Sequence, residues 1–154
     1  MADCKDHIKC VETSLKQADL ICLDNKLRFT ELRKKVFSII SKSHEPAKAY
    51  DILSELQKED STAKPSTVYR TLDFLLENGL IHKLHSSNSY ALCGHPAKKH
   101  GQCYFLICEK CNVTKECCSK SLTSKIEDIA KDNNFITKNI TIEIRGLCSN
   151  CSVN

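Results

Sequence analysis

The chain has 154 residues, of which 41% are hydrophobic and 27% charged, and its formal net charge is +4. This length suits one domain or two small ones, and no apolar run approaches the roughly 18 residues that span a bilayer. The net charge is too small to identify nucleic acid as a partner. Residues 1–6 carry charges of both signs with no apolar run behind them, so we expect no secretory signal and a cytoplasmic location.

Apolar residues at helical spacing predict four helices in the first half of the chain. The first has an apolar stripe that begins at Ile8, and the second begins after Thr30, which suits an N-cap. The third has Pro46 in its first turn. The fourth opens at Pro65 and stops at Gly79, where glycine permits a left-handed turn.

Short β-rich runs follow these helices. Strands are predicted at 80–84 and 89–92, and with the last three helices they make a winged helix-turn-helix. The first helix is then an extra N-terminal arm. Further along, a strand at 103–107, a helix at 121–133 and a strand at 140–144 predict a small α/β unit with little core of its own.

The predicted fold class is therefore mixed α and β, in two domains. We expect a winged-helix domain at 1–86, a hinge at 87–94 and a small α/β domain at 95–154. A metal site and a dimer interface would both stabilise so small a second domain.

Eleven cysteines are the anomaly of this composition. An odd number cannot all pair in disulfides, and clustered cysteines in a cytosolic chain more often bind metal. Two Cys-x-x-Cys pairs, Cys108 with Cys111 and Cys148 with Cys151, each follow a predicted strand. Four thiolates match a closed, tetrahedral structural zinc site. The alternatives are four thiols without metal or a redox motif, and two matched pairs are hard to explain by the latter.

A looser set of metal-binding residue types lies around the predicted hinge. Its members are His82, Cys93, His95, His100, Cys103 and Glu116. Nitrogen, sulfur and oxygen donors together suit Zn²⁺, and the thiolate weighs against Fe²⁺ and Mn²⁺. Scattered histidines are usually surface residues, so spacing alone leaves open whether a second metal site exists.

The fourth predicted helix carries residue types that bind DNA. On a helix, Tyr69 and Arg70 point away from the apolar face, and arginine can pair with guanine in the major groove. Ser66 and Thr67, at the helix start, could bind phosphate through hydroxyl and backbone N–H groups. The segment 26–42 adds local positive charge. The alternative is an ordinary solvated helix face.

At these residues the chain resembles the ferric uptake regulator family of metal-dependent repressors, and most closely its zinc uptake regulator branch. The family's patterns occur as RFTELR at 28–33 and KPSTVYRTLDFLLE at 64–77. NSYALC at 88–93 and GLCSNC at 146–151 are similar to the zinc branch. The histidine-rich stretch that iron-sensing relatives carry before the first Cys-x-x-Cys pair is absent. The resemblance covers roughly residues 8–151.

The resemblance implies a homodimer that binds double-stranded operator DNA and represses zinc-uptake genes. In it, 1–86 is the winged-helix DNA-binding domain and 95–154 the zinc-stapled dimerisation domain. It also implies two Zn²⁺ per subunit, with no membrane or small-molecule substrate as partner. It implies structural zinc at Cys108, Cys111, Cys148 and Cys151. It implies sensing zinc at His82, Cys93, His100 and Glu116, with His95 as the alternative histidine. It also implies that Arg70 reads bases and that Tyr50 adds a DNA contact to those of Ser66, Thr67 and Tyr69.

Three other functions are compatible with parts of the sequence. A regulator of the same fold could sense another metal or peroxide through extra thiols at Cys103, Cys117 and Cys118. A zinc hydrolase could use Glu116 as its base, but the chain has no HExxH motif and no glycine-rich phosphate loop among its four glycines. A metallochaperone would have no use for the fourth helix. We therefore expect no enzymatic activity.

Overall fold

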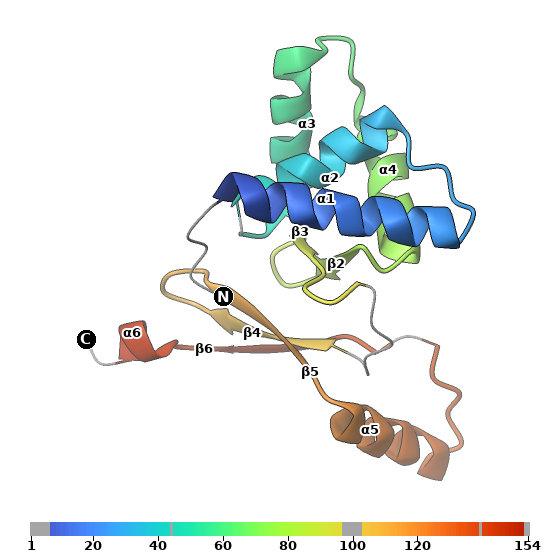
Figure 1. Ribbon diagram of the computed structural model, residues 1–154. Helices are drawn as coiled ribbons and strands as arrows, with labels where there is room; N and C mark the ends of the chain where they lie inside the picture. The colour runs from blue at the N-terminus through green and yellow to red at the C-terminus, as the bar shows by residue number, and fades with distance from the viewer. Residues whose placement is uncertain (1–6, 44, 97–102, 139, 153–154) are drawn as a thin grey trace. The chain divides into compact units, whose positions relative to one another are not determined.

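The computed structural model describes residues 7–43, 45–96, 103–138 and 140–152 (Figure 1). These residues fall into two compact units, one within 7–96 and the other within 103–152. Within these ranges no helix combines the length and the apolar character needed to cross a membrane.

Four helices make up most of the first unit, and α2 contacts each of the other three. Val36, Phe37 and Ile40 of α2 are fully buried and share one apolar core with Ile52 of α3 and Leu72 of α4. The helices are α1 (His7–Asp24), α2 (Glu31–Ser43), α3 (Ala49–Glu59) and α4 (Pro65–Glu77). This core confirms that the predicted apolar faces of the last three helices pack together.

A short turn joins α3 to α4, as in a helix-turn-helix (Figure 1). The Asp60 carboxylate accepts hydrogen bonds from the Thr62 hydroxyl at 2.6 Å and the Thr62 N–H at 3.0 Å, and these bonds lower the pKa of Asp60. Helix α4 then begins at Pro65 and ends where Gly79 takes a φ of 64°. Both ends of this helix are as predicted.

A three-stranded antiparallel sheet completes the first unit, in the order β1-β3-β2. Its strands are β1 (Ala47–Lys48), β2 (Ile81–Leu84) and β3 (Ser89–Leu92). Leu80 and Tyr90 belong to the same core as the helices, and β3 contacts α2. The wing is therefore packed onto the helical core, and the winged-helix prediction is confirmed. Strand β3 occupies part of the segment predicted as a hinge.

The second unit is a three-stranded sheet with one longer helix. Its elements are β4 (Cys103–Cys108), β5 (Thr114–Cys118), α5 (Lys120–Asp132), β6 (Ile142–Gly146) and α6 (Ser149–Ser152). The strand order is β5-β4-β6; β5 pairs antiparallel with β4, and β6 pairs parallel with it after a connection through α5. Among the described residues of this unit only Cys103, Phe105 and Cys108 are buried. So small a core needs an additional source of stability.

Several details differ from the sequence predictions. Ile8, which begins the predicted apolar stripe of the first helix, is 72% exposed. Pro46 lies before β1 and not in the first turn of α3, because residues 47–48 pair with β3 before the helix starts. Strand β5 was not predicted, because its sequence TKECC lacks the alternation of apolar and polar residues that marks a half-buried strand. Strand β6 begins at Ile142, two residues later than expected.

The turn after α4 gives a test of this local structure. Gly79 has a φ of 64°, and a Cβ there would meet no atom within 4 Å, so Gly79→Ala adds backbone strain without a clash. We expect it to lower the free energy of unfolding by about 1 kcal/mol, measured by urea denaturation. Gly146→Ala is the matched control, because a Cβ there also meets open space and the φ is not positive. Equal losses in both variants would contradict this explanation.

Candidate metal centres and nucleic-acid surface

The four cysteines of the two Cys-x-x-Cys pairs converge at one end of the second sheet. Cys108 ends β4 and is paired in register with Gly146 at the end of β6, so parallel pairing brings together segments 40 residues apart in sequence. A tight turn, with Asn112 at a φ of 57°, places Cys111 beside Cys108. The first turn of α6 does the same for Cys151 and Cys148, whose backbones are hydrogen-bonded at 2.9 Å.

The distances between these sulfurs fit a tetrahedral zinc ion. The four Sγ atoms lie within 4.8 Å of one another, and those of Cys111 and Cys148 are 3.7 Å apart. A tetrahedron with Zn–S bonds of about 2.3 Å has S–S edges of about 3.8 Å. The donor set and its spacing could therefore hold a zinc ion in a closed, all-thiolate site.

Electrostatics in this cluster also favours a bound cation. The backbone N–H of Cys148 donates to the Cys108 sulfur at 3.4 Å and, with the N–H of Cys111, lowers the pKa of Cys108 to about 6. The Cys148 side chain, by contrast, raises the pKa of Cys151 to about 12. Without metal, interactions within the cluster therefore favour the thiolate at Cys108 but disfavour it at Cys151. A divalent cation removes this conflict, because it binds thiolates and displaces their protons.

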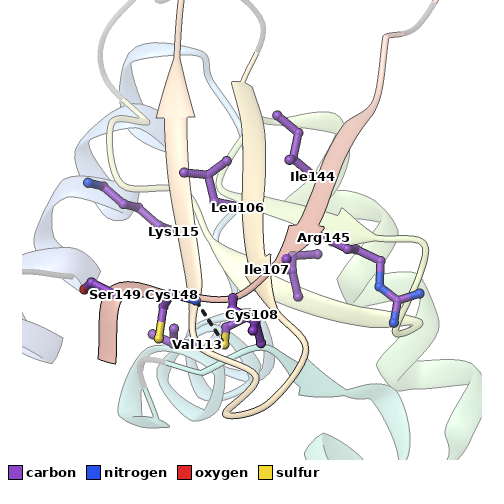
Figure 2. A pocket seen from close by; sticks show the side chains of 11 residues that line it. Leu106, Ile107, Cys108, Val113, Lys115, Ile144, Arg145, Cys148 and Ser149 are labelled. Carbon is purple, nitrogen blue, oxygen red and sulfur yellow. Dashed lines mark hydrogen bonds between the residues drawn. The ribbon is translucent and has the colours of Figure 1, made fainter. Parts of the chain in front are cut away.

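A cavity of about 420 Å³ adjoins this end of the second sheet (Figure 2). Leu106 and Ile144, which are paired in register on β4 and β6, line it together with Ile107. Cys108 and Cys148 lie along the same wall, where the dashed line in Figure 2 joins the Cys148 nitrogen to the Cys108 sulfur. The apolar side chains beside the cysteine cluster are partly exposed, at 39% for Leu106 and 48% for Ile144.

The wing hairpin brings together two of the predicted sensing ligands, His82 and Cys93. His82 lies on β2 opposite Ala91, and Cys93 extends the ladder by donating its N–H to the Leu80 carbonyl at 3.1 Å. Residues directly opposite on an antiparallel pair share a face, so His82 and Cys93 are diagonal neighbours on one face. Cys93 is buried, and His95, the alternative histidine, is exposed two residues further on.

The other predicted sensing residues belong to the second half of the chain. Glu116 lies half-buried on β5, opposite Phe105. Its carboxylate accepts the S–H of Cys118 at 3.7 Å, and the Cys118 sulfur is 2.7 Å from that of Cys103 across the hairpin. Burial raises the pKa of Cys103. His100 lies outside the described residues, so the four-residue sensing site stays a prediction.

The pairing of Cys103 with Cys118 was missed by sequence reasoning. The sequence shows both cysteines, but only the register of β4 with β5 places them opposite each other. Since β5 itself was not predicted, no sequence signal linked the two residues.

The DNA-binding residue types occupy one exposed face of α4. Ser66, Tyr69 and Arg70 are exposed on that face, while Val68 and Leu72 on the other are fully buried. The first turn of α4 contains no acidic residue, and its N-cap is Lys64. The first turn thus adds no negative charge at the positive end of the helix dipole.

Two further predicted contacts differ in their accessibility. Thr67 is half-buried, and its carbonyl accepts the hydroxyl of Thr71 at 3.0 Å. Tyr50, near the start of α3, is 77% exposed.

Part of the basic charge at 26–42 is used inside the first unit. Lys34 pairs with Asp19 of α1 at 3.2 Å, and Lys35 pairs with Glu59 of α3 at 3.0 Å. Such exposed pairs contribute about 0–1 kcal/mol each. Their main consequence is that the charges of Lys34 and Lys35 are partly neutralised. The segment 26–42 therefore offers less positive charge to DNA than its sequence suggests.

Comparison with known proteins gives a consistent result. The profile of the ferric uptake regulator family matches residues 24–145. The zinc uptake regulation protein of Escherichia coli (strain K12) is 37% identical over 137 residues, which are 89% of this chain and 80% of that protein.

Solved structures agree with these sequence matches. A zinc uptake regulator complexed with zinc and DNA aligns with a TM-score of 0.88 and 36% identity, over 93% of this chain and 95% of that one. The holo structure of XcZur aligns with a TM-score of 0.85 and 34% identity, over 92% of this chain and 99% of that one. The apo structure of XcZur aligns over 94% of this chain and 99% of that one at 33% identity, but with a TM-score of only 0.55. The holo and apo structures of that relative therefore differ in conformation.

Proposed function

This chain belongs to the ferric uptake regulator family, and we propose that it is a zinc-responsive DNA-binding repressor of zinc-uptake genes. The observation that carries the proposal is the exposed face of α4, with Arg70 on a winged helix, in a chain that aligns over 93% of its length with a zinc uptake regulator complexed with zinc and DNA. The protein acts as a regulator and not as an enzyme, and it is located in the cytoplasm.

Helix α4 is the part that enters the major groove. Arg70 pairs with the O6 and N7 atoms of guanine, and Tyr69 extends the same exposed face. Ser66 and Thr67, at the positive end of the helix dipole, bind backbone phosphate. Tyr50 adds a contact from α3. In a homodimer the two α4 helices meet successive major grooves about 34–36 Å apart, so the operator has two half-sites.

The second unit supplies the structural zinc and the dimer interface. Cys108, Cys111, Cys148 and Cys151 bind one zinc that ties β4 to the chain after β6. Apolar side chains support the assignment of a dimer interface to this unit, because they are left exposed here: Leu106, Ile129, Phe135, Ile136, Ile144 and Leu147.

The second zinc of each subunit is the regulatory one. His82 and Cys93 of the wing, with His100 and Glu116, form a mixed nitrogen, sulfur and oxygen donor set that suits Zn²⁺ better than Fe²⁺ or Mn²⁺. His95 is the alternative histidine. One ion bound by residues of both domains would restrict their relative motion and hold the two α4 helices at the spacing of the operator. The different holo and apo structures of XcZur support a metal-dependent change of this kind.

The energies required are within the usual range. Moving a regulator from about 1% to about 99% competent requires about 5.5 kcal/mol of differential binding. Two regulatory zinc ions per dimer share this, at about 2.7 kcal/mol each, which is within the 1–3 kcal/mol typical of coupling between sites. Coupling between two binding sites is reciprocal, so operator DNA tightens zinc binding by the same factor.

The decisive experiment is a gel shift on the promoter of a zinc importer, with buffered free Zn²⁺, Fe²⁺ or Mn²⁺. Binding that needs Zn²⁺ supports the proposal. Binding driven by Fe²⁺ or Mn²⁺ alone, or binding that peroxide abolishes at constant zinc, would support the alternative of another sensed signal. The zinc uptake regulators among the relatives favour zinc over that alternative.

Removing one thiol of the four-cysteine cluster tests the structural zinc. We expect Cys148→Ser to lose one zinc per subunit and to give unfolded or insoluble protein, because the second unit buries only three of its described residues. Metal content by mass spectrometry and far-UV circular dichroism measure this. Cys117→Ser, half-buried on β5, is the control and should keep its zinc. A stable Cys148→Ser dimer with full metal content would refute the role of this site.

Removing the wing thiol tests the regulatory zinc. We expect Cys93→Ser to remain a folded dimer with its structural zinc but to lose zinc-dependent operator binding in a gel shift. Cys22→Ser is the matched control, since Cys22 is another buried thiol of the same unit, 1% exposed against 3% for Cys93. Unchanged repression by Cys93→Ser would rule out a sensing role for this residue.

Substitution of Arg70 separates base reading from phosphate binding. Arg70→Ala should weaken operator binding by about 1–3 kcal/mol and relax the preference for one base pair, measured on an operator library. Arg70→Lys keeps the charge but loses the bidentate geometry. If lysine restores binding to all sequences equally, Arg70 contacts phosphate and not a base.

A further inference from the structure

Two thiols face each other across the β4–β5 hairpin. Cys103 and Cys118 are directly opposite in register, and their sulfurs are 2.7 Å apart. Opposed residues on antiparallel strands have Cα atoms about 4.5 or 5.5 Å apart, depending on the type of pair. Both values lie within the roughly 4.4–6.8 Å that a disulfide spans. The Cα spacing of such a pair is therefore compatible with a disulfide.

The distance between these sulfurs distinguishes them from the metal cluster in the same unit. Two sulfurs that share a tetrahedral zinc are about 3.8 Å apart, which matches the 3.7 Å between Cys111 and Cys148. At 2.7 Å, Cys103 and Cys118 would have to move apart by about 1 Å to share a zinc, but together by only about 0.7 Å to bond to each other. The spacing of the pair is therefore closer to that of a disulfide than to that of two zinc ligands.

We infer that Cys103 and Cys118 form an oxidisable dithiol site, which a low-molecular-weight disulfide converts into an intramolecular disulfide. The site goes beyond the proposed function, because its chemistry requires neither zinc sensing nor DNA binding. The bond would form beside Glu116, whose carboxylate is 3.7 Å from the Cys118 sulfur. The disulfide would therefore affect binding of the regulatory zinc. Only this last consequence rests on the proposed function.

The reaction is a two-step exchange. Cys118 reacts first because it is half-buried, whereas Cys103 is only 5% exposed. Its sulfur attacks one sulfur of the reagent disulfide. The reagent S–S bond breaks, and the leaving thiolate takes the proton of Cys118. The Cys103 sulfur then attacks the Cys118 sulfur of the mixed disulfide, and the second reagent thiolate leaves with the proton of Cys103. The dithiol loses two electrons and two protons, and the reagent gains them as two thiols.

Cys117 provides an internal comparison on the same strand. It lies next to Cys118, but its side chain is on the opposite face and its partner across the hairpin is Tyr104. The exchange at Cys117 therefore has no opposing thiol to complete its second step. The same reagent should leave a mixed disulfide at Cys117 and a protein disulfide at Cys118.

The test uses the zinc-loaded, full-length protein, so that the four-cysteine cluster is occupied. It is incubated with oxidised glutathione, and the cysteines are mapped by peptide mass spectrometry. We expect the Cys103–Cys118 disulfide in about tenfold excess over the glutathione adduct at Cys118, because the opposing thiol is already oriented. Cys117 should carry glutathione. Dithiothreitol should reverse both changes.

Two variants make the result decisive. Cys103→Ser should leave glutathione on Cys118, because the resolving thiol is gone, while Cys117→Ser should form the Cys103–Cys118 bond as the wild type does. Accumulation of the Cys118 adduct in the wild type would overturn the inference. So would a bond from Cys118 to another cysteine, or a Cys103–Cys118 pair that stays reduced while Cys117 is modified. None of these outcomes depends on operator binding, so failure of the proposed function would be seen separately.

Discussion

The parallel pairing of β4 with β6 is the interaction on which the second half of this protein depends. It places the end of β4 beside the end of β6, so that Cys108 lies next to Gly146 and two cysteine pairs from distant parts of the chain meet. Parallel pairing requires a long crossover, here through α5, and closing such a connection costs conformational entropy. The proposed zinc ion, bound by the four thiolates, would offset that cost at the point where the strands end.

The two units differ in how they are stabilised. The first has a continuous apolar core to which its helices and its wing contribute, as expected of a domain that folds by burying apolar surface. The second buries only Cys103, Phe105 and Cys108 among its described residues. We therefore propose that it relies on metal binding and on association. This difference gives a physical reason for the proposal that the regulator has a permanent structural zinc as well as an exchangeable one.

Cysteine serves two different chemistries within the second unit, and geometry separates them. Sulfurs brought together by strand ends and tight turns are spaced for a metal ion, whereas sulfurs opposite each other on neighbouring strands are spaced for a covalent bond. The same residue type is thus spaced for different chemistry at two places in one small unit. Strand register, and not sequence distance, decides between the two.

The sequence alone determined the winged-helix architecture, the ends of α4 and the two Cys-x-x-Cys motifs themselves. These features depend on helical periodicity, on Pro65 and Gly79 as boundary residues, and on motif spacing, all of which are local. The tertiary structure decided what depends on non-local pairing. It established strand β5, the contact of Cys103 with Cys118, and the shared face of His82 and Cys93. It also showed that Ile8 is exposed and that Lys34 and Lys35 are paired within the first unit. A short polar strand such as β5 forms because its neighbour offers backbone hydrogen bonds, and no pattern within its own residues records that neighbour.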